Sequence, residues 1–296
     1  MNTLLDEDIS KILKTYKIPA EEVEKVVSNN LDVNLKLRRL LEGKNENVKR
    51  TGEYKDFIKK VRKEIYYKLR KYSFDKEGFE AQLTILRQGY DKTTLDKKAS
   101  ENKLDGTPFE WFVQNHASTR ERSLYIKEFN ERLVNFIKED KHILDLGGGL
   151  YPLTFPFSAL NNLRQYTWVD KDKDSWNVLK EFCKTTDKPK INLYNELIGA
   201  REWKEYLPNN TNDFDTVLML KLVPVIQRQE KDLLEILAKA PTKRFIVTGS
   251  KDAMTRNKDI EKRERHVCEK FITLTNRKVV GQFEIENEFA YVLASP

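Results

Sequence analysis

Apolar side chains in the first 110 residues recur every three or four positions, which is the spacing of amphipathic helices. The pattern predicts helices near residues 9–16, 19–27, 31–41, 53–71 and 76–88. In the fourth of these, Phe57, Val61, Ile65 and Leu69 follow one another at intervals of four, with most of the lysines elsewhere around the helix. We therefore expect an all-helical amino-terminal domain over residues 1–110.

The pattern changes after residue 116, where a helix is followed by short apolar runs. Ser118 and Glu121 have the spacing of a capping box, which predicts a helix from Ser118 to about Lys138. Five apolar runs then alternate with helical segments, at residues 142–146, 166–169, 191–194, 216–220 and 245–248. This alternation predicts an α/β domain over residues 111–296 with a mostly parallel sheet. Two further apolar runs near the end of the chain, 279–285 and 289–293, are close enough in sequence to form an antiparallel hairpin.

A glycine-rich segment, Asp145-Leu146-Gly147-Gly148-Gly149, ends the first predicted strand. Glycines here let the backbone turn tightly and approach a ligand at the carboxyl edge of a sheet. No Lys-Ser/Thr pair follows, which excludes a P-loop. The acidic residue suits a ligand with an ammonium group, such as S-adenosyl-L-methionine, better than a pyrophosphate. The candidate cofactor contacts in this segment are therefore Asp145, Gly147, Gly148 and Gly149, although Asp145 could instead be a loop or helix-capping aspartate.

Four further polar residues follow the ends of later strands. Asp170 ends the second predicted strand, where a carboxylate can accept both hydroxyls of a ribose. Asn195 and Glu196 follow the third, in the loop that usually meets the adenine of a cofactor in parallel sheets of this kind. The side-chain amide of Asn195 can both donate and accept hydrogen bonds at the edge of that ring. Lys221 follows the fourth, on the side where a transferred methyl group would lie. For Asp170, Asn195 and Lys221, a turn residue or a solvated loop charge is the alternative.

Basic residues are concentrated in one helical segment. The net charge is +7 and the pI is about 9.0. Between Lys49 and Lys71 there are ten basic and three acidic residues, which is typical of a surface that binds a polyanion. Lys59, Lys60, Arg62 and Lys63 are the candidate RNA contacts. A solvated helix in a protein rich in lysine and glutamate is the alternative interpretation.

The remaining composition favours a cytoplasmic protein. Charged residues make up 34% of the chain, and no apolar run is long enough to cross a bilayer. The amino terminus lacks the apolar core of a signal peptide. Cys183 and Cys268 cannot hold a metal cluster by themselves, and two thiols are a better expectation than a disulfide. We expect a cytoplasmic monomer without a metal or a membrane partner.

Three segments together resemble the aminoglycoside-resistance 16S ribosomal RNA (guanine-N7) methyltransferases. These are His116–Arg122 (His-Ala-Ser-Thr-Arg-Glu-Arg), Leu144–Leu153 and Lys221–Ile226, and they follow the family's order within roughly residues 53–293. A mostly parallel sheet that ends in an antiparallel hairpin strand likewise resembles the Rossmann-like fold of class I methyltransferases. Tyr151 departs from the family, which has Asn there, and Asn195 departs where the family often has Asp.

The resemblance implies a helical domain that docks on the small ribosomal subunit and an enzyme that methylates a decoding-site guanine of ribosomal RNA. It implies that His116, Arg122 and Lys221 edge the methyl-transfer site. It also implies a set of residues that contact or frame S-adenosyl-L-methionine, namely Tyr72, Asp145, Gly147, Asp170, Asn195 and Leu222.

Other functions stay open at the level of the sequence. The chain could methylate another RNA or another base position, or it could bind nucleic acid through a methyltransferase fold that is not catalytic. A small-molecule methyltransferase is a third alternative. The pair of Asp145 and Asp170 argues against a decayed cofactor site, and the basic helical segment argues against a small-molecule substrate.

Overall fold

The chain forms two compact units, which are considered separately. The computed structural model describes residues 3–16, 18–42, 46–69, 74–88, 107–185, 189–253 and 259–295. One unit comprises Met1–Lys71 and the short segment Asp252–Asp259, and the other comprises Tyr72–Lys251 and Ile260–Pro296. Among the described residues, no helix is both long and apolar enough to span a bilayer.

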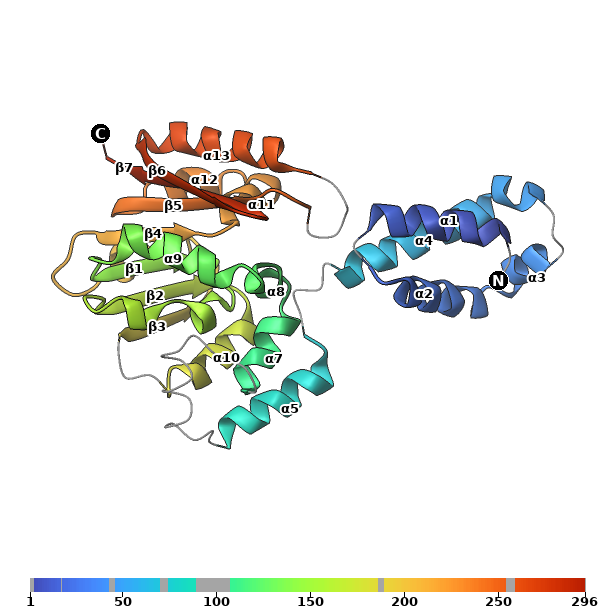
Figure 1. Ribbon diagram of the computed structural model, residues 1–296, viewed down its shortest axis with the longest axis horizontal. Helices are drawn as coiled ribbons and strands as arrows, with labels where there is room; N and C mark the ends of the chain where they lie inside the picture. The colour runs from blue at the N-terminus through green and yellow to red at the C-terminus, as the bar shows by residue number, and fades with distance from the viewer. Residues whose placement is uncertain are drawn as a thin grey trace. The chain divides into compact units, whose positions relative to one another are not determined.

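The amino-terminal unit is helical, as the apolar spacing predicts. It contains α1 (Thr3–Thr15), α2 (Ala20–Asp32), α3 (Leu35–Glu42), the short 3-10 helix η1 (Glu46–Arg50) and α4 (Gly52–Leu69). The apolar faces of these helices, drawn in blue to cyan in Figure 1, pack into one core. Helix α4 contributes Phe57, Val61 and Ile65 to that core. Its lysines at positions 55, 59, 60 and 63 are left exposed.

The second unit is built on a sheet of seven strands. The strands are β1 (His142–Leu146), β2 (Gln165–Asp170), β3 (Lys190–Asn195), β4 (Phe214–Met219), β5 (Thr242–Ser250), β6 (Lys278–Ile285) and β7 (Glu288–Ala294). Their order is β3-β2-β1-β4-β5-β7-β6. The first five strands are parallel, and β7 runs antiparallel to both β5 and β6. The predicted parallel sheet with a closing hairpin is therefore confirmed.

Helices cover both faces of this sheet (Figure 1). The core on one face joins α5 (Lys76–Arg87), α7 (Pro108–Asn115), α9 (Ile126–Ile137) and α10 (Lys173–Phe182) to the strands. The core on the other face joins α11 (Leu222–Gln229), α12 (Leu233–Ala238) and α13 (Glu261–Thr275). Successive strand residues face opposite sides, so Ile143 lies in the first core and Leu144 in the second. The unit is a three-layer α/β/α sandwich.

The division between the units falls between Lys71 and Tyr72, whereas the sequence pattern placed it at residue 110. The difference comes from α5, which packs on the sheet unit rather than on α1–α4. Its Phe79 ring meets Phe112 of α7 edge-to-face, with centroids 5.7 Å apart. Helical spacing shows that a segment is amphipathic but not which core its apolar face enters, so the sequence could not assign α5.

The helix predicted over residues 118–138 is interrupted. Helix α8 (Ala117–Ser123) ends before Tyr125, and α9 begins at Ile126. The predicted capping box does not start α8, because its N-cap residue is His116 and no side chain caps it. The Glu121 carboxylate instead forms an ion pair with Lys221, as described below. Ser118 and Glu121 have the spacing of the motif, but the Glu121 carboxylate binds the Lys221 ammonium instead.

Candidate functional site

The glycine loop after β1 meets two different requirements. Gly147 and Gly149 have φ values of +65° and +50°, in the left-handed region that favours glycine. Gly148 has a different constraint, since a Cβ there would lie 2.1 Å from Oδ2 of Asp145. The loop therefore passes directly over the Asp145 carboxylate, and any side chain at Gly148 would displace it.

Asp145 is the most unusual group at this edge of the sheet, because its side chain is fully buried. Oδ2 accepts a hydrogen bond of 2.7 Å from the Tyr166 hydroxyl. Oδ1 is buried and has no hydrogen-bond partner among the described residues. Burial raises the pKa of this carboxyl group to about 7. A buried carboxylate oxygen with no donor is a site at which a cation or a hydrogen-bond donor would be stabilising.

Asp170 ends β2 beside this loop and holds it in place. Its Oδ2 accepts a hydrogen bond of 2.9 Å from the Gly149 backbone N–H, and its Oδ1 accepts one of the same length from Asp172. Trp168 of the same strand donates its indole N–H to the Gly149 carbonyl at 3.0 Å. Each carboxylate oxygen of Asp170 keeps a second lone pair that can accept a hydroxyl group. Asp145 and Asp170 thus lie at the carboxyl ends of adjacent strands, as the sequence predicts.

The two residues after β3 differ in how they are engaged. The Asn195 side chain is exposed, and its amide N–H donates to the Asp170 backbone carbonyl at 3.0 Å. The Glu196 carboxylate accepts hydrogen bonds from the Tyr206 hydroxyl at 2.5 Å and from Arg201 at 2.8 Å. Asn195 therefore lies beside the Asp170 end of the site, whereas Glu196 is committed to a local surface cluster.

Helix α11, which follows β4, meets the glycine loop through its first residue, Leu222. A Cβ on Gly147 would lie 2.8 Å from a terminal methyl group of Leu222, so the leucine packs directly against the loop. Lys221, one residue earlier, caps the start of α11 with a φ of +58°. The carboxyl ends of β1 and β4 are adjacent in the sheet, and Leu222 and Gly147 are thereby brought together.

Arg122 and Lys221 meet around a residue that the sequence did not single out, Glu288 at the start of β7. Arg122 is buried and binds the Glu288 carboxylate through both Nε and Nη2, at 3.0 and 2.9 Å. The Lys221 ammonium lies 3.6 Å from Glu288 and 3.2 Å from Glu121. Burial alone would raise the pKa of Glu288, but Arg122 and Lys221 outweigh that effect and lower it. The cluster therefore holds two positive and two negative side chains.

His116 lies apart from this cluster. Its ring is buried, with Nε2 4.0 Å from the Asp172 carboxylate and its centroid 5.8 Å from that of Phe74. Burial lowers the pKa of the imidazole to about 4, so the ring is neutral at physiological pH. The three residues predicted at the methyl-transfer edge are thus divided: Arg122 and Lys221 share Glu288, while His116 lies near the Asp170 end. Tyr72 lies outside the described residues.

Within the described residues, no group of three or more His, Cys, Asp or Glu side chains could hold a metal ion. Cys183 and Cys268 are free thiols, as expected from the sequence.

No family model matches the sequence. The curated 16S rRNA (guanine(1405)-N(7))-methyltransferase of Proteus mirabilis is 23% identical over 183 residues, covering 60% of this chain and 62% of the relative. The chain thus matches less than two thirds of the length of that relative.

Two solved structures are similar over most of the chain. The 16S rRNA methylase ArmA is 22% identical with a TM-score of 0.51, over 70% of this chain and 98% of that one. The 16S rRNA methyltransferase RmtF, solved with S-adenosyl-L-homocysteine, is 18% identical with a TM-score of 0.54, over 100% of both chains. These two matches confirm the fold class that the sequence predicts.

The buried Asp145 carboxyl generates a prediction about stability. Its folded pKa of about 7 lies above the ordinary aspartate value of 3.8, so the folded protein binds this proton more tightly than the unfolded chain. The contribution of Asp145 to the free energy of unfolding should therefore fall as pH rises from about 4 to about 7, on the order of 1.4 kcal/mol per pKa unit. Asp145→Asn should remove this dependence and make the ligand-free protein more stable at pH 8 than the wild type.

Denaturant unfolding of wild type and variant at pH 5 and pH 8 measures the effect. Burial also raises the pKa of Asp140, to about 6, so the informative quantity is the difference between variant and wild type at each pH. Asp232→Asn, at an exposed position, is the matched control and should change neither value. Equal stability of Asp145→Asn and wild type at both pH values would show that the carboxyl carries no such penalty.

Proposed function

We propose that this chain is an S-adenosyl-L-methionine-dependent methyltransferase that modifies the 16S ribosomal RNA of the small ribosomal subunit, at N7 of a decoding-site guanine. The observation that carries the proposal is the unpaired buried oxygen of Asp145 beneath the glycine loop, one strand away from Asp170. The names of the similar proteins support the substrate, because all three are 16S rRNA methylases or methyltransferases. The base position is supported by the name of the Proteus mirabilis relative, which specifies guanine N7.

The residues at the carboxyl edge fit this cofactor group by group. The ammonium of its amino-acid portion would be the missing partner of Asp145 Oδ1, and the ribose hydroxyls suit the remaining lone pairs of Asp170. Asn195 lies beside Asp170, where its amide can meet the edge of an adenine. Gly147 and Leu222 would frame the bound molecule from the β4 side. When bound, the cofactor supplies a methyl group on a positively charged sulfur.

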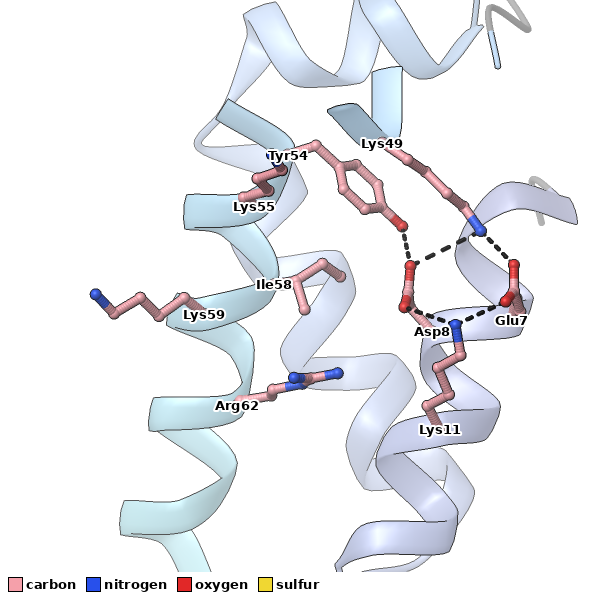
Figure 2. Close-up of a pocket in the computed structure, with 9 residues that line it drawn as sticks. All are labelled: Glu7, Asp8, Lys11, Lys49, Tyr54, Lys55, Ile58, Lys59 and Arg62. Atoms are coloured by element: carbon pink, nitrogen blue, oxygen red, sulfur yellow. Dashed lines mark hydrogen bonds and ion pairs between the residues drawn. The ribbon is translucent and has the colours of Figure 1, made fainter. Parts of the chain in front are cut away.

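The helical unit offers a surface for the RNA backbone. Lys59, Lys60, Arg62 and Lys63 are all exposed on α4. Figure 2 shows a hollow between α1 and α4 in which Glu7 and Asp8 are bound by Lys11, Lys49 and the Tyr54 hydroxyl, while the side chain of Arg62 extends from α4. The carboxylates of Glu7 and Asp8 on α1 are therefore already bound by hydrogen-bond donors within the hollow.

The basic residues of α4 that line the same hollow are available to a ligand. Lys55, Lys59 and Arg62 follow one another at helical spacing and form no ion pair with a described residue. An RNA phosphate could bind there without first breaking a salt bridge to any of the described residues. This supports the assignment of the basic segment to RNA rather than to a merely solvated helix.

The proposed transfer needs orientation more than proton removal. Guanine N7 already presents a lone pair in the plane of the base, so no general base has to act first. The chain must then hold N7 in line with the methyl group, and orientation of this kind can lower a barrier by several kcal/mol. The methylated base gains a positive charge, so the Lys221 ammonium is unsuited to lie against N7. It suits guanine O6 or a phosphate as a hydrogen-bond donor.

The role assigned to Asp170 predicts a loss of cofactor affinity. Asp170→Ala should weaken binding by about 1–3 kcal/mol, because hydroxyl groups and the Gly149 N–H lose their acceptor. Isothermal titration calorimetry on the folded variant measures this. Asp174→Ala, in the first turn of the next helix, is the matched control and should bind the cofactor as wild type does. Unchanged affinity in Asp170→Ala would remove this residue from the site.

The role assigned to α4 predicts that RNA and cofactor binding separate by unit. Replacing Lys59, Lys60, Arg62 and Lys63 by alanine should weaken RNA binding and flatten its salt dependence, by about one unit of slope per lost phosphate contact. Cofactor affinity should not change. A variant with four exposed lysines of the sheet unit replaced has the same net charge and should keep the wild-type RNA affinity; these are Lys231, Lys239, Lys262 and Lys270. Equal salt slopes in the two variants would make the α4 residues a solvated face.

The base position predicts a chemical signature in the product. RNA treated with the protein and cofactor should contain 7-methylguanosine, so borohydride reduction followed by aniline should cleave it at one site. At saturating cofactor, turnover should show no essential base near neutral pH, and Lys221→Ala should slow transfer while still binding the cofactor. A product identified by mass spectrometry as 1-methylguanosine or a methyladenosine would exclude N7 but not methyl transfer. Cofactor binding without transfer to any RNA would instead indicate a non-catalytic fold.

A further inference from the structure

A hydrogen-bonded chain links the backbone of Lys221 to a strand that the sequence analysis did not connect with the site. We propose that Thr248 of β5 and Glu288 of β7 are positioning residues that hold Lys221 for methyl transfer. The inference rests on the function proposed above. It assigns Arg122 an indirect part, acting through Glu288 rather than on a substrate.

Thr248 uses both capacities of its hydroxyl group for this purpose. The side chain is fully buried near the carboxyl end of β5. Its oxygen accepts a hydrogen bond of 2.9 Å from the Lys221 backbone N–H, and its proton is donated to Glu288 Oε1 at 2.5 Å. Because one hydroxyl proton serves one acceptor, the direction of both bonds is fixed. The threonine therefore couples the backbone at the end of β4 to the carboxylate on β7.

Glu288 holds the other end of the same lysine. Its carboxylate receives Arg122 through two N–H groups, Thr248 through the hydroxyl, and the Lys221 ammonium at 3.6 Å. The neighbouring turn residue Asn287 donates its side-chain amide to the Glu121 carbonyl at 2.7 Å. Glu121 in turn lies 3.2 Å from the Lys221 ammonium. The hairpin thus carries the Glu288 carboxylate and contacts the backbone of Glu121, whose side chain is the other carboxylate beside the ammonium.

The backbone of Lys221 indicates that its placement is costly and maintained. Its φ of +58° lies in the left-handed region, which is strained for a residue with a Cβ. Strain of this kind persists where the surroundings hold it in place, and it is common at functional sites. Here the Thr248 hydroxyl receives the N–H of the strained residue. The side chain of Lys221 remains 16% exposed, so its ammonium can still reach a ligand.

A second threonine–carboxylate–arginine cluster lies at the opposite edge of the sheet and is a natural control. Thr216 of β4 is also fully buried, and its hydroxyl donates to Asp140 Oδ2 at 2.5 Å. Arg244 lies 3.3 Å from the same carboxylate. The two threonines have the same burial, the same acceptor type and the same bond length. Only Thr248 is connected to Lys221.

The test compares Thr248→Val with Thr216→Val, each of which removes one buried hydroxyl and keeps the branched shape of the side chain. With holoenzyme and small-subunit RNA, Thr248→Val should lower kcat about tenfold, as expected for the loss of one such hydrogen bond in the transition state. Its cofactor Kd should stay within about twofold of wild type, because the hydroxyl touches neither Asp145 nor Asp170. Thr248→Ser restores the hydroxyl and should recover kcat, whereas Thr216→Val should leave kcat unchanged.

A second readout does not depend on catalysis. Competitive acylation of lysines, read by mass spectrometry, reports how firmly the Lys221 ammonium is held. Labelling of Lys221 should rise several-fold in Thr248→Val and stay at the wild-type value in Thr248→Ser and Thr216→Val. If Thr248→Val matches Thr216→Val in both kcat and labelling, the proposal is overturned and the cluster is only structural. If the wild type methylates no RNA, the proposed function fails, and the labelling still decides whether Thr248 positions Lys221.

Discussion

The sheet unit is organised around a carboxylate in a place where a carboxylate is expensive. Asp145 lies near the carboxyl end of the inner strand β1 and is fully buried, so its ionised form loses hydration that one tyrosine hydroxyl replaces only in part. The surrounding chain is shaped by that side chain. Gly148 has no Cβ because the carboxylate occupies the space, and the loop continues to Gly149, whose backbone is held from β2 by Trp168 and Asp170. An apolar residue at position 145 would remove the desolvation cost of the buried carboxylate, but it would also remove the oxygen that could bind a cation beneath the loop.

The Arg122–Glu288 pair presents the same trade-off in a different form. Both side chains are buried, and an ion pair removed from water is on balance close to neutral for stability compared with apolar side chains of similar size. Its retention is therefore better explained by geometry than by energy. The pair places a negative charge next to Lys221 without leaving any of the buried charges unpaired, and aromatic rings of Phe129 and Tyr151 face the arginine at 4.6 and 5.2 Å.

The sequence could predict the features that depend on residues close together along the chain. Strand period, glycine content and the acidic residues at strand ends are local, so the sheet and the positions of Asp145 and Asp170 follow from them. The Arg122–Glu288 pair joins residues 166 positions apart, and a glutamate at the start of a hairpin strand resembles any surface residue until β7 is placed between β5 and β6. The burial of His116 and the core that α5 joins depend on tertiary packing in the same way.

The position of β7 also has a consequence for the order of assembly. The strand that carries Glu288 is inserted between β5 and β6, although it is made after both. The first five strands can pair in parallel as they emerge, but the cluster that holds Lys221 closes a loop of 166 residues and must form late. Until residue 288 has been synthesised, a nascent chain can have a complete glycine loop and no anchored lysine. The hairpin is therefore the last part of the chain to be synthesised before the Lys221 cluster can be completed.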